Sequence, residues 1–256
     1  MKFGQIIKEH MAMKSIVYLS AFFLLVIVPG TSAQDKETIL AEGDSREIFE
    51  KKFRWGISYH QYWSTITGDN LPKNYFLKPS LGFNIRAEYY FNSFLGIGAG
   101  FGVQQRGAGV INQDNYGGSF SHPWIKPNGD IDSTYTQKLR FNTLEVPLTL
   151  LLRTPKNVIK GVRLSAAAGI IYIHNYQTND VWVDVGTGNH LDNFVTDDYT
   201  RNDLGYQISF GPEINAGESN LIQVHFVYTQ GTKNIYAVGQ GEGRQVTLGV
   251  RVAWLF

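Results

Sequence analysis

Residues 95–103 read Leu-Gly-Ile-Gly-Ala-Gly-Phe-Gly-Val, with an apolar side chain at every odd position and glycine at every even position. Residues 245–256 alternate in the same way and place on one face Val246, Leu248, Val250, Val252, Trp254 and Phe256. Such alternation has the two-residue period of a β-strand and not the 3.6-residue period of a helix. The two stretches therefore predict an all-β fold.

The same period recurs along the chain in eight segments of about 10 to 17 residues each. They cover residues 54–66, 79–92, 94–107, 137–153, 161–176, 203–216, 221–230 and 243–256. Strands of soluble sandwiches usually have five or six residues, whereas a tilted strand needs about 9 to 11 residues to cross a bilayer. The lengths favour strands that span a membrane.

The connections between these segments alternate between short and long. The short ones are residues 92–93, 154–160 and 217–220, and the long ones are 67–78, 108–136, 177–202 and 231–242. Short turns on one side and long loops on the other are typical of outer-membrane barrels with an even strand number. We therefore expect the long loops to be extracellular and both chain ends to lie on the periplasmic side.

The two faces of these strands decide between a membrane barrel and a soluble barrel of the lipocalin kind. One face carries aromatic side chains, among them Tyr59, Tyr89, Phe91, Phe101, Tyr206, Phe210, Phe226, Tyr228, Trp254 and Phe256. A closed sheet of eight strands has an interior too narrow for that many rings, whereas lipid can accommodate them. The sequence thus predicts an eight-stranded antiparallel up-and-down transmembrane β-barrel with its apolar face toward lipid.

The opposite face carries charged side chains that would line the barrel interior. The predicted interior network consists of Arg86, Glu88, Arg106, Glu145, Glu213, His225 and Arg251. Charges in so narrow a space must pair, so we expect structural ion pairs rather than a conducting path. A tight turn at 92–94 would also place Glu88 opposite Gly98, where the missing side chain leaves room for a large neighbour.

The N-terminal residues carry the features of an export signal. A run of thirteen apolar or small residues, 16–28, follows Lys14 and precedes a small-residue segment that ends at Ala33. The run is short for a bilayer-spanning helix, and this order of regions is that of a secretory signal peptide. We expect residues 1–33 to be cleaved, with translation starting at Met1, Met11 or Met13. Residues 34–53 would form a charged periplasmic segment, and residues 54–256 the barrel domain.

Composition excludes several classes of protein. The chain has no cysteine, which rules out disulfides, thiolate metal sites and a cysteine nucleophile. Its net charge of +1 gives no basis for nucleic-acid binding. The acidic loops lack the spacing of a calcium site, and no G-x-S-x-G segment is present. We therefore expect no metal, no cofactor and no enzymatic activity.

Three further segments resemble a known family. The C-terminal residues Trp254 and Phe256 are similar to the terminal strand signal of Gram-negative outer-membrane proteins. Residues 100–107 (GFGVQQRG) and 144–152 (LEVPLTLLL) are similar to the G-x-x-x-x-Q-[KR]-G and L-E-[IV]-P-L segments of the small outer-membrane β-barrel family that includes the PorT-like proteins. The resemblance covers residues 54–256.

The resemblance implies more than the alternation does. It implies that Arg106 and Glu145 are inward polar positions and that Pro147 is a characteristic strand interruption. It also implies a place in the outer membrane, and a role in secretion of surface proteins for some members.

The sequence favours a non-enzymatic integral outer-membrane protein with a structural or interaction role through its external loops. Its expected partners are outer-membrane lipid, the export and barrel-assembly machinery, and a protein or ligand at the long loops. One alternative is a narrow channel or transporter. A second is a membrane-embedded lipid hydrolase or acyltransferase, for which Ser58 with His60, or Ser209 with His225, would supply the hydroxyl and the base.

Overall fold

The computed structural model describes the barrel as one unit. The described residues are 51–68, 75–110, 135–184, 190–217, 220–236 and 242–256. The predicted signal peptide, nearly all of the charged segment 34–53 and most of the long loop 108–136 lie outside them, and those assignments stay predictions.

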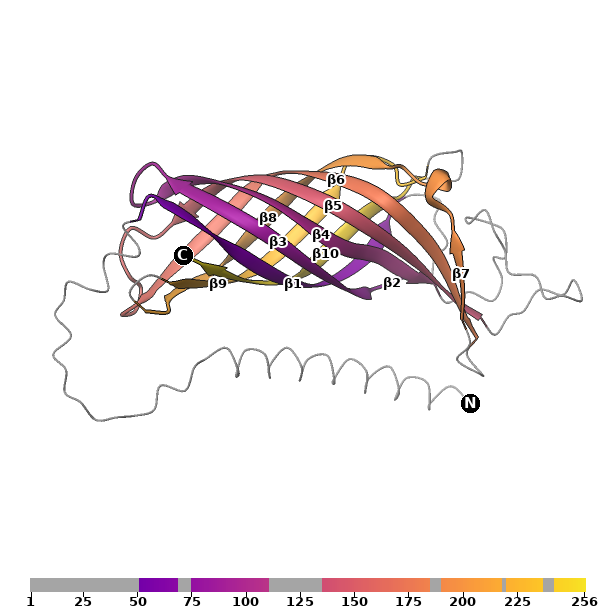
Figure 1. Ribbon diagram of the computed structural model, residues 1–256, viewed down its shortest axis with the longest axis horizontal. Helices are drawn as coiled ribbons and strands as arrows, with labels where there is room; N and C mark the ends of the chain where they lie inside the picture. The colour runs from indigo at the N-terminus through magenta and orange to yellow at the C-terminus, as the bar shows by residue number, and fades with distance from the viewer. Residues whose placement is uncertain (1–50, 69–74, 111–134, 185–189, 218–219, 237–241) are drawn as a thin grey trace, which may run out of the picture. The chain divides into compact units, whose positions relative to one another are not determined.

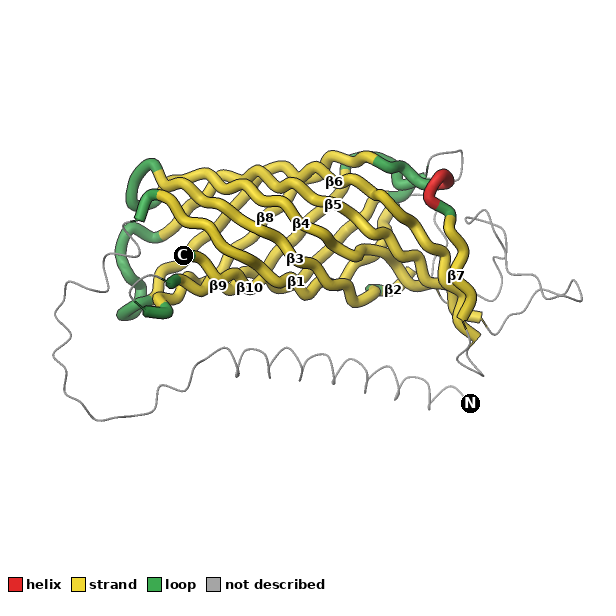
Figure 2. Tube along the Cα trace, in the orientation of Figure 1, coloured by secondary structure: helices red, strands yellow, loops and turns green. Residues whose placement is uncertain are grey.

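Eight long antiparallel strands close into a barrel, as Figures 1 and 2 show. The eight long strands are β1 (Phe53–Thr67), β3 (Lys78–Tyr90), β4 (Leu95–Val110), β5 (Tyr135–Arg153), β6 (Val162–Asp184), β8 (Asn202–Asn215), β9 (Leu221–Gly231) and β10 (Arg244–Leu255). Two short strands, β2 (Tyr75–Phe76) and β7 (His190–Phe194), pair with β4 and β6. Each long strand pairs with the next along the chain, β1 also pairs with β10, and the β4–β5 pairing completes the circle. The predicted eight-stranded up-and-down barrel is confirmed.

The prediction that residues 177–202 form only a loop is wrong. β6 continues to Asp184, the short strand β7 pairs with its last residues, and a 3-10 turn, η1 (Thr196–Asp198), follows. The reason lies in residues 181–183, Val-Trp-Val, which favour a strand and find a partner in the start of β5. Sheet therefore extends beyond the predicted end of β6. Figure 1 shows β7 and the end of β6 together at one end of the barrel.

The pairing of β3 with β4 has the predicted register. Arg86 lies opposite Gly100, Glu88 opposite Gly98, and Tyr90 opposite Gly96. The turn between them is held by the side chain of Asn92, whose Oδ1 accepts hydrogen bonds from the backbone N–H groups of Phe94 and Leu95 at 3.0 and 2.8 Å.

Burial alternates along most of each long strand, and runs of consecutive buried residues occur in β1, β4 and β6. On β3 the even-numbered side chains are buried, whereas the odd-numbered ones, such as Phe83 and Ile85, stay about 60% exposed. Such large apolar side chains exposed in rows are explained by contact with lipid, since soluble proteins rarely expose contiguous patches of this size. Among the described residues, no helix is long and apolar enough to cross a bilayer.

Pro147 lies inside β5 and is buried, on the inward face. Proline has no N–H to donate, and the β4–β5 ladder omits the pairs that Pro147 and Val146 would make with Gly100 and Phe101. The strand itself continues on both sides of this gap. The interruption that the resemblance implies therefore affects only the pairing of β5 with β4, and the pairing of β5 with β6 is continuous at Pro147.

Candidate functional site

The barrel interior near the short turns holds the largest group of buried charges. Arg86 Nε lies 2.6 Å from Glu88 Oε1, and Arg54 lies 3.6 Å from Glu213. Gln223 joins the two pairs, since its amide nitrogen donates to Glu88 at 3.1 and 3.2 Å and to Glu213 at 3.0 Å. The four charged residues come from three strands, β1, β3 and β8, and Gln223 from β9.

An aromatic ring covers this group. The hydroxyl of Tyr90 donates to Glu213 at 3.4 Å, and the guanidinium of Arg153 lies 3.7 Å from the centre of the Tyr90 ring. At the same end, Leu221, Ala253 and Leu255 form a small apolar cluster with no exposed surface. The interior is therefore filled at the end where the turns are short.

A second ion pair lies toward the long loops. Arg106 Nε lies 2.6 Å from Glu145 Oε1, and the hydroxyl of Thr143 donates to the same oxygen at 3.1 Å. With its amide nitrogen turned toward the carboxylate, Gln104 donates to both oxygens of Glu145 at 2.9 and 3.1 Å. The carboxylate thus has donors on both oxygens, which compensates for its burial.

His225 lies between Ser165, Ser209 and Arg251. Arg251 donates from Nη2 to His225 Nδ1 at 2.8 Å, and Ser165 Oγ lies 2.7 Å from His225 Nε2. Because a guanidinium can only donate, Nδ1 carries a lone pair and Nε2 carries the proton. His225 therefore donates to Ser165 and cannot accept a proton from that hydroxyl.

His60 lies between two hydroxyl groups. Ser58 Oγ donates to the carbonyl oxygen of Asn84 at 3.4 Å and lies 2.8 Å from His60 Nε2. The other ring nitrogen lies 2.7 Å from the hydroxyl of Tyr62. Both ring nitrogens of His60 therefore contact hydroxyl groups inside the barrel.

The model of the outer membrane protein beta-barrel domain matches residues 33–236, which is most of the chain. This chain belongs to the outer membrane protein beta-barrel domain family. It is an outer-membrane protein, and the narrower PorT-like resemblance remains a prediction.

Three outer-membrane proteins of known structure are similar to this chain at low sequence identity. Ail of Yersinia pestis is 12% identical, with 80% of this chain and 100% of that chain covered and a TM-score of 0.36. OprG of Pseudomonas aeruginosa is 11% identical, with coverages of 80% and 94% and a TM-score of 0.39. Neisserial surface protein A is 11% identical, with coverages of 79% and 96% and a TM-score of 0.38. A comparison with curated proteins gives no match.

This outer-membrane barrel has an apolar cap at the end of the long loops. The cap is a buried cluster of Ile66, Ala108, Leu139, Phe141, Val195, Tyr199, Ile235 and Tyr236. A backbone hydrogen bond joins the β7–β8 and β9–β10 connections, from Thr200 N–H to the Ile235 carbonyl at 2.8 Å. A second lies within the β9–β10 connection, from Ile235 N–H to the Gly243 carbonyl at 2.7 Å. Burial raises the pKa of the Tyr199 phenol, and Asp180 and Tyr236 add to the rise, so this ring stays neutral.

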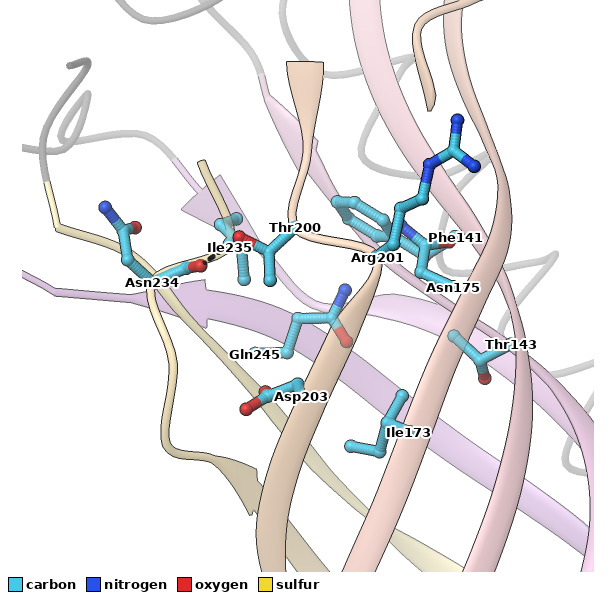
Figure 3. Close-up of a pocket in the computed structure, with 10 residues that line it drawn as sticks. All are labelled: Phe141, Thr143, Ile173, Asn175, Thr200, Arg201, Asp203, Asn234, Ile235 and Gln245. Atoms are coloured by element: carbon cyan, nitrogen blue, oxygen red, sulfur yellow. Dashed lines mark hydrogen bonds between the residues drawn. The ribbon is translucent and has the colours of Figure 1, made fainter. Parts of the chain in front are cut away.

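A small cavity lies beneath the cap, as Figure 3 shows. It is lined by Phe141, Thr143, Ile173, Asn175, Thr200, Arg201, Asp203, Asn234, Ile235 and Gln245. Its volume is about 20 Å³, which is room for a single water molecule. Asn175 Oδ1 is buried and has no protein partner, so an ordered water there would satisfy it.

The structure places all seven interior residues named from the sequence inside the barrel and divides them into three groups. Arg86, Glu88 and Glu213 share one group, Arg106 and Glu145 form the second, and His225 and Arg251 the third. Of the C-terminal residues, Phe256 packs against Trp55 with ring centres 5.3 Å apart, whereas Trp254 lies half-buried on the outward face.

Sequence reasoning missed two parts of this interior. Arg54 is fully buried, and its position on the same face as Ser58 and His60 could have identified it. The cap had no such signal, because Val195 and Tyr199 lie in a segment without periodicity. Around the described residues, no group of histidine and acidic side chains is arranged to hold a metal ion.

Proposed function

We propose that this outer-membrane barrel is a sealed, non-enzymatic protein that acts as a structural element and as a contact surface outside the cell. The observation that carries the proposal is the filled interior. Ion pairs and an apolar cluster occupy the end near the short turns, and the apolar cap occupies the other end.

The filled interior argues against the channel alternative. Ions would have to displace carboxylates that already have arginine and amide donors, and would then meet the apolar cap. Removing one partner of a buried ion pair costs about 3–5 kcal/mol. In planar bilayers we expect no steady conductance above the bare membrane. Discrete, long-lived channels from protein with folded gel mobility would refute this part of the proposal.

The hydrogen-bond directions argue against the hydrolase alternative. A nucleophilic serine needs a histidine nitrogen that accepts its proton, yet His225 donates to Ser165, and Arg251 donates to Nδ1, the nitrogen nearest Ser209. Both histidines are also buried inside the wall, away from lipid. We expect unchanged lipid composition in vesicles incubated with the protein. Lipid turnover that His225→Gln abolishes would contradict a non-enzymatic role.

The extended strands support a contact role. β6 has 23 residues and β5 has 19, about twice the 9 to 11 that a tilted strand needs to cross a bilayer. Their ends, with β7, form a sheet beyond the apolar band, and Phe194 on β7 is 72% exposed. An exposed aromatic on a short edge strand is a common anchor for a protein partner.

The test of the contact role uses cells that display the protein. Partners crosslinked to wild-type protein are compared with those of a variant in which residues 185–189 are replaced by a Gly-Ser linker of equal length. Loss of specific partners with normal folded mobility supports the proposal. Identical crosslinks in both proteins would refute a role for the β6–β7 hairpin.

Export completes the proposal. We propose that residues 1–33 are a signal peptide cleaved after Ala33, that residues 34–53 remain in the periplasm, and that Trp254 and Phe256 engage the barrel-assembly machinery. N-terminal sequencing of the protein from outer membranes should begin at Gln34. A chain that retains Lys14 would refute the cleavage. A Phe256→Ala variant that assembles at the wild-type rate would refute the terminal signal.

A further inference from the structure

The turn between β5 and β6, residues 154–161, is folded against the start of β6. The backbone N–H of Val158 donates to the Val162 carbonyl at 2.8 Å, and the N–H of Val162 donates to the Ile159 carbonyl at 2.9 Å. Gly161 closes this tight hairpin with a φ of +74°, a conformation that favours glycine. The hydrogen bonds therefore fix Ile159 beside the first residue of β6.

Side chains hold the rest of the turn to the wall. Arg163, an inward residue of β6, donates from Nε to Asn157 Oδ1 at 3.1 Å. Thr154 Oγ accepts from the backbone N–H of Leu164 at 3.1 Å, and the backbone N–H of Thr154 donates to the Leu164 carbonyl at 2.8 Å. The turn is thus a continuation of the barrel wall, and the side chains that it exposes have fixed positions.

The turn exposes two large apolar side chains. Ile159 is 69% exposed and Val158 is 56% exposed. Ile159 forms a bridge with Val162, and Val162 pairs with Ile214 of β8, which pairs in turn with Ile222 on the outward face of β9. Direct partners in an antiparallel sheet point to the same face. Ile159 therefore extends the lipid-facing side of the wall.

Two lysines flank this apolar pair. Residues 156–160 read Lys-Asn-Val-Ile-Lys, and both lysines are exposed. Neither belongs to an ion pair within the part of the chain that the structure describes. A lysine can lay its aliphatic stem along an apolar surface while its ammonium group stays among polar headgroups. An outward isoleucine between two such lysines matches the boundary between hydrocarbon and anionic headgroups.

We propose that the β5–β6 turn binds an anionic phospholipid of the periplasmic leaflet. Ile159 contacts the acyl chains, and Lys156 and Lys160 bind the phosphate oxygens. The leaflet follows from the predicted periplasmic position of the short turns. Lipid is favoured over a periplasmic protein because Ile159 continues a row of side chains that already face lipid. This site is independent of the contact role proposed above.

The first measurement is the depth of the turn in a bilayer. The chain has no cysteine, so Ile159→Cys provides a single site for a spin label. The labelled protein is reconstituted in bilayers of phosphatidylcholine and phosphatidylglycerol, and collisions of the label with oxygen and with a water-soluble nickel complex are compared. The controls are Ile85→Cys, on the lipid face of β3, and Lys233→Cys, exposed in the β9–β10 connection. We expect the label at position 159 to behave like the one at 85, and nickel access equal to that at 233 would overturn the proposal.

The second measurement is retention of the anionic lipid. Protein extracted from nanodiscs of the same two lipids is examined by native mass spectrometry for bound phosphatidylglycerol. The test variant is Lys156→Gln/Lys160→Gln, and the matched control is Lys51→Gln/Lys52→Gln, which removes two exposed lysines that precede β1. Each basic residue near an anionic surface strengthens binding about fivefold, so the test variant should retain about 25-fold less phosphatidylglycerol than wild type. Heat-modifiable gel mobility confirms that each protein is folded.

Three results of the retention measurement would overturn the site. The first is equal retention by wild type and the test variant. The second is an equal loss in the control, because the lysines of this turn would then have no special part in binding. The third is retention that appears only after Glu218→Gln, since this carboxylate of the β8–β9 turn would then neutralise the lysines. Displacement of the bound lipid by glycerol phosphate in solution would overturn the lipid as the ligand.

Discussion

The buried pair of Arg86 and Glu88 allows a quantitative test of the interior network. Glu88 accepts from Arg86 at 2.6 Å and from Gln223 at 3.1 and 3.2 Å, and neither charged side chain is exposed beyond 5%. Glu88→Ala leaves the guanidinium buried without this partner. The expected loss of unfolding free energy is about 3–5 kcal/mol. For a barrel of this size the loss lowers the melting temperature by roughly 10 °C.

The double variant Arg86→Met/Glu88→Leu distinguishes the effect of an unpaired buried charge from the effect of lost side-chain volume. It removes both charges and keeps most of the volume, so we expect its stability to lie within about 2 kcal/mol of wild type. The control is Arg201→Gln, which breaks an exposed pair with Asp197 at 2.5 Å and should cost less than about 1 kcal/mol.

Urea unfolding in detergent micelles, followed by tryptophan fluorescence and gel mobility, measures all three variants. A Glu88→Ala protein within 1 kcal/mol of wild type would refute the reasoning. So would a double variant that is as unstable as the single one, because the charge would then not be the cause.

Three further predictions concern the glycine row, the cap and the extracellular strand. Gly102→Ala should impair folding because a Cβ there lies 2.2 Å from a backbone oxygen, whereas Gly98→Ala, at 3.1 Å from a threonine hydroxyl, should fold; gel mobility distinguishes them. Tyr199→Ala removes the ring that packs edge-on against Phe141 at 5.2 Å and should raise hydrogen exchange in the cap without opening a steady conductance. Phe194→Asp should change stability by less than about 0.5 kcal/mol, as measured by urea unfolding, because the side chain is 72% exposed.

The alternation of side chains predicted most of the fold. In a barrel wall, successive residues of a strand point alternately inward and outward, so an odd or even position decides whether a side chain is buried. Residues such as Glu145 and Glu213 could therefore be assigned to the interior before their partners were known. Strand ends agree with the predicted ones to within three residues, except where β6 continues into the segment expected to be a loop.

The hydrogen-bond and ion-pair partners of the inward side chains could not be predicted from the alternation. Arg106 of β4 pairs with Glu145 of the neighbouring strand β5. Glu88 of β3, in contrast, binds Gln223 of β9, which lies 135 residues further along the chain. Such contacts cross the barrel lumen and depend on strand tilt and stagger, which the period of two does not encode. The cap depends in the same way on loop conformation.

The glycine row raises a question of register that the polar network resolves. Because residues 96, 98, 100 and 102 are all glycine, a two-residue slip of β3 along β4 would still place Glu88 opposite a glycine and leave every side chain on its own face. The glycines therefore provide space without fixing the pairing. The slip would, however, carry Glu88 about 7 Å along the strand, away from Gln223 of β9. The charged network specifies the register that a uniform glycine row allows to vary, and this is a reason for placing ion pairs in an interior that apolar side chains could also fill.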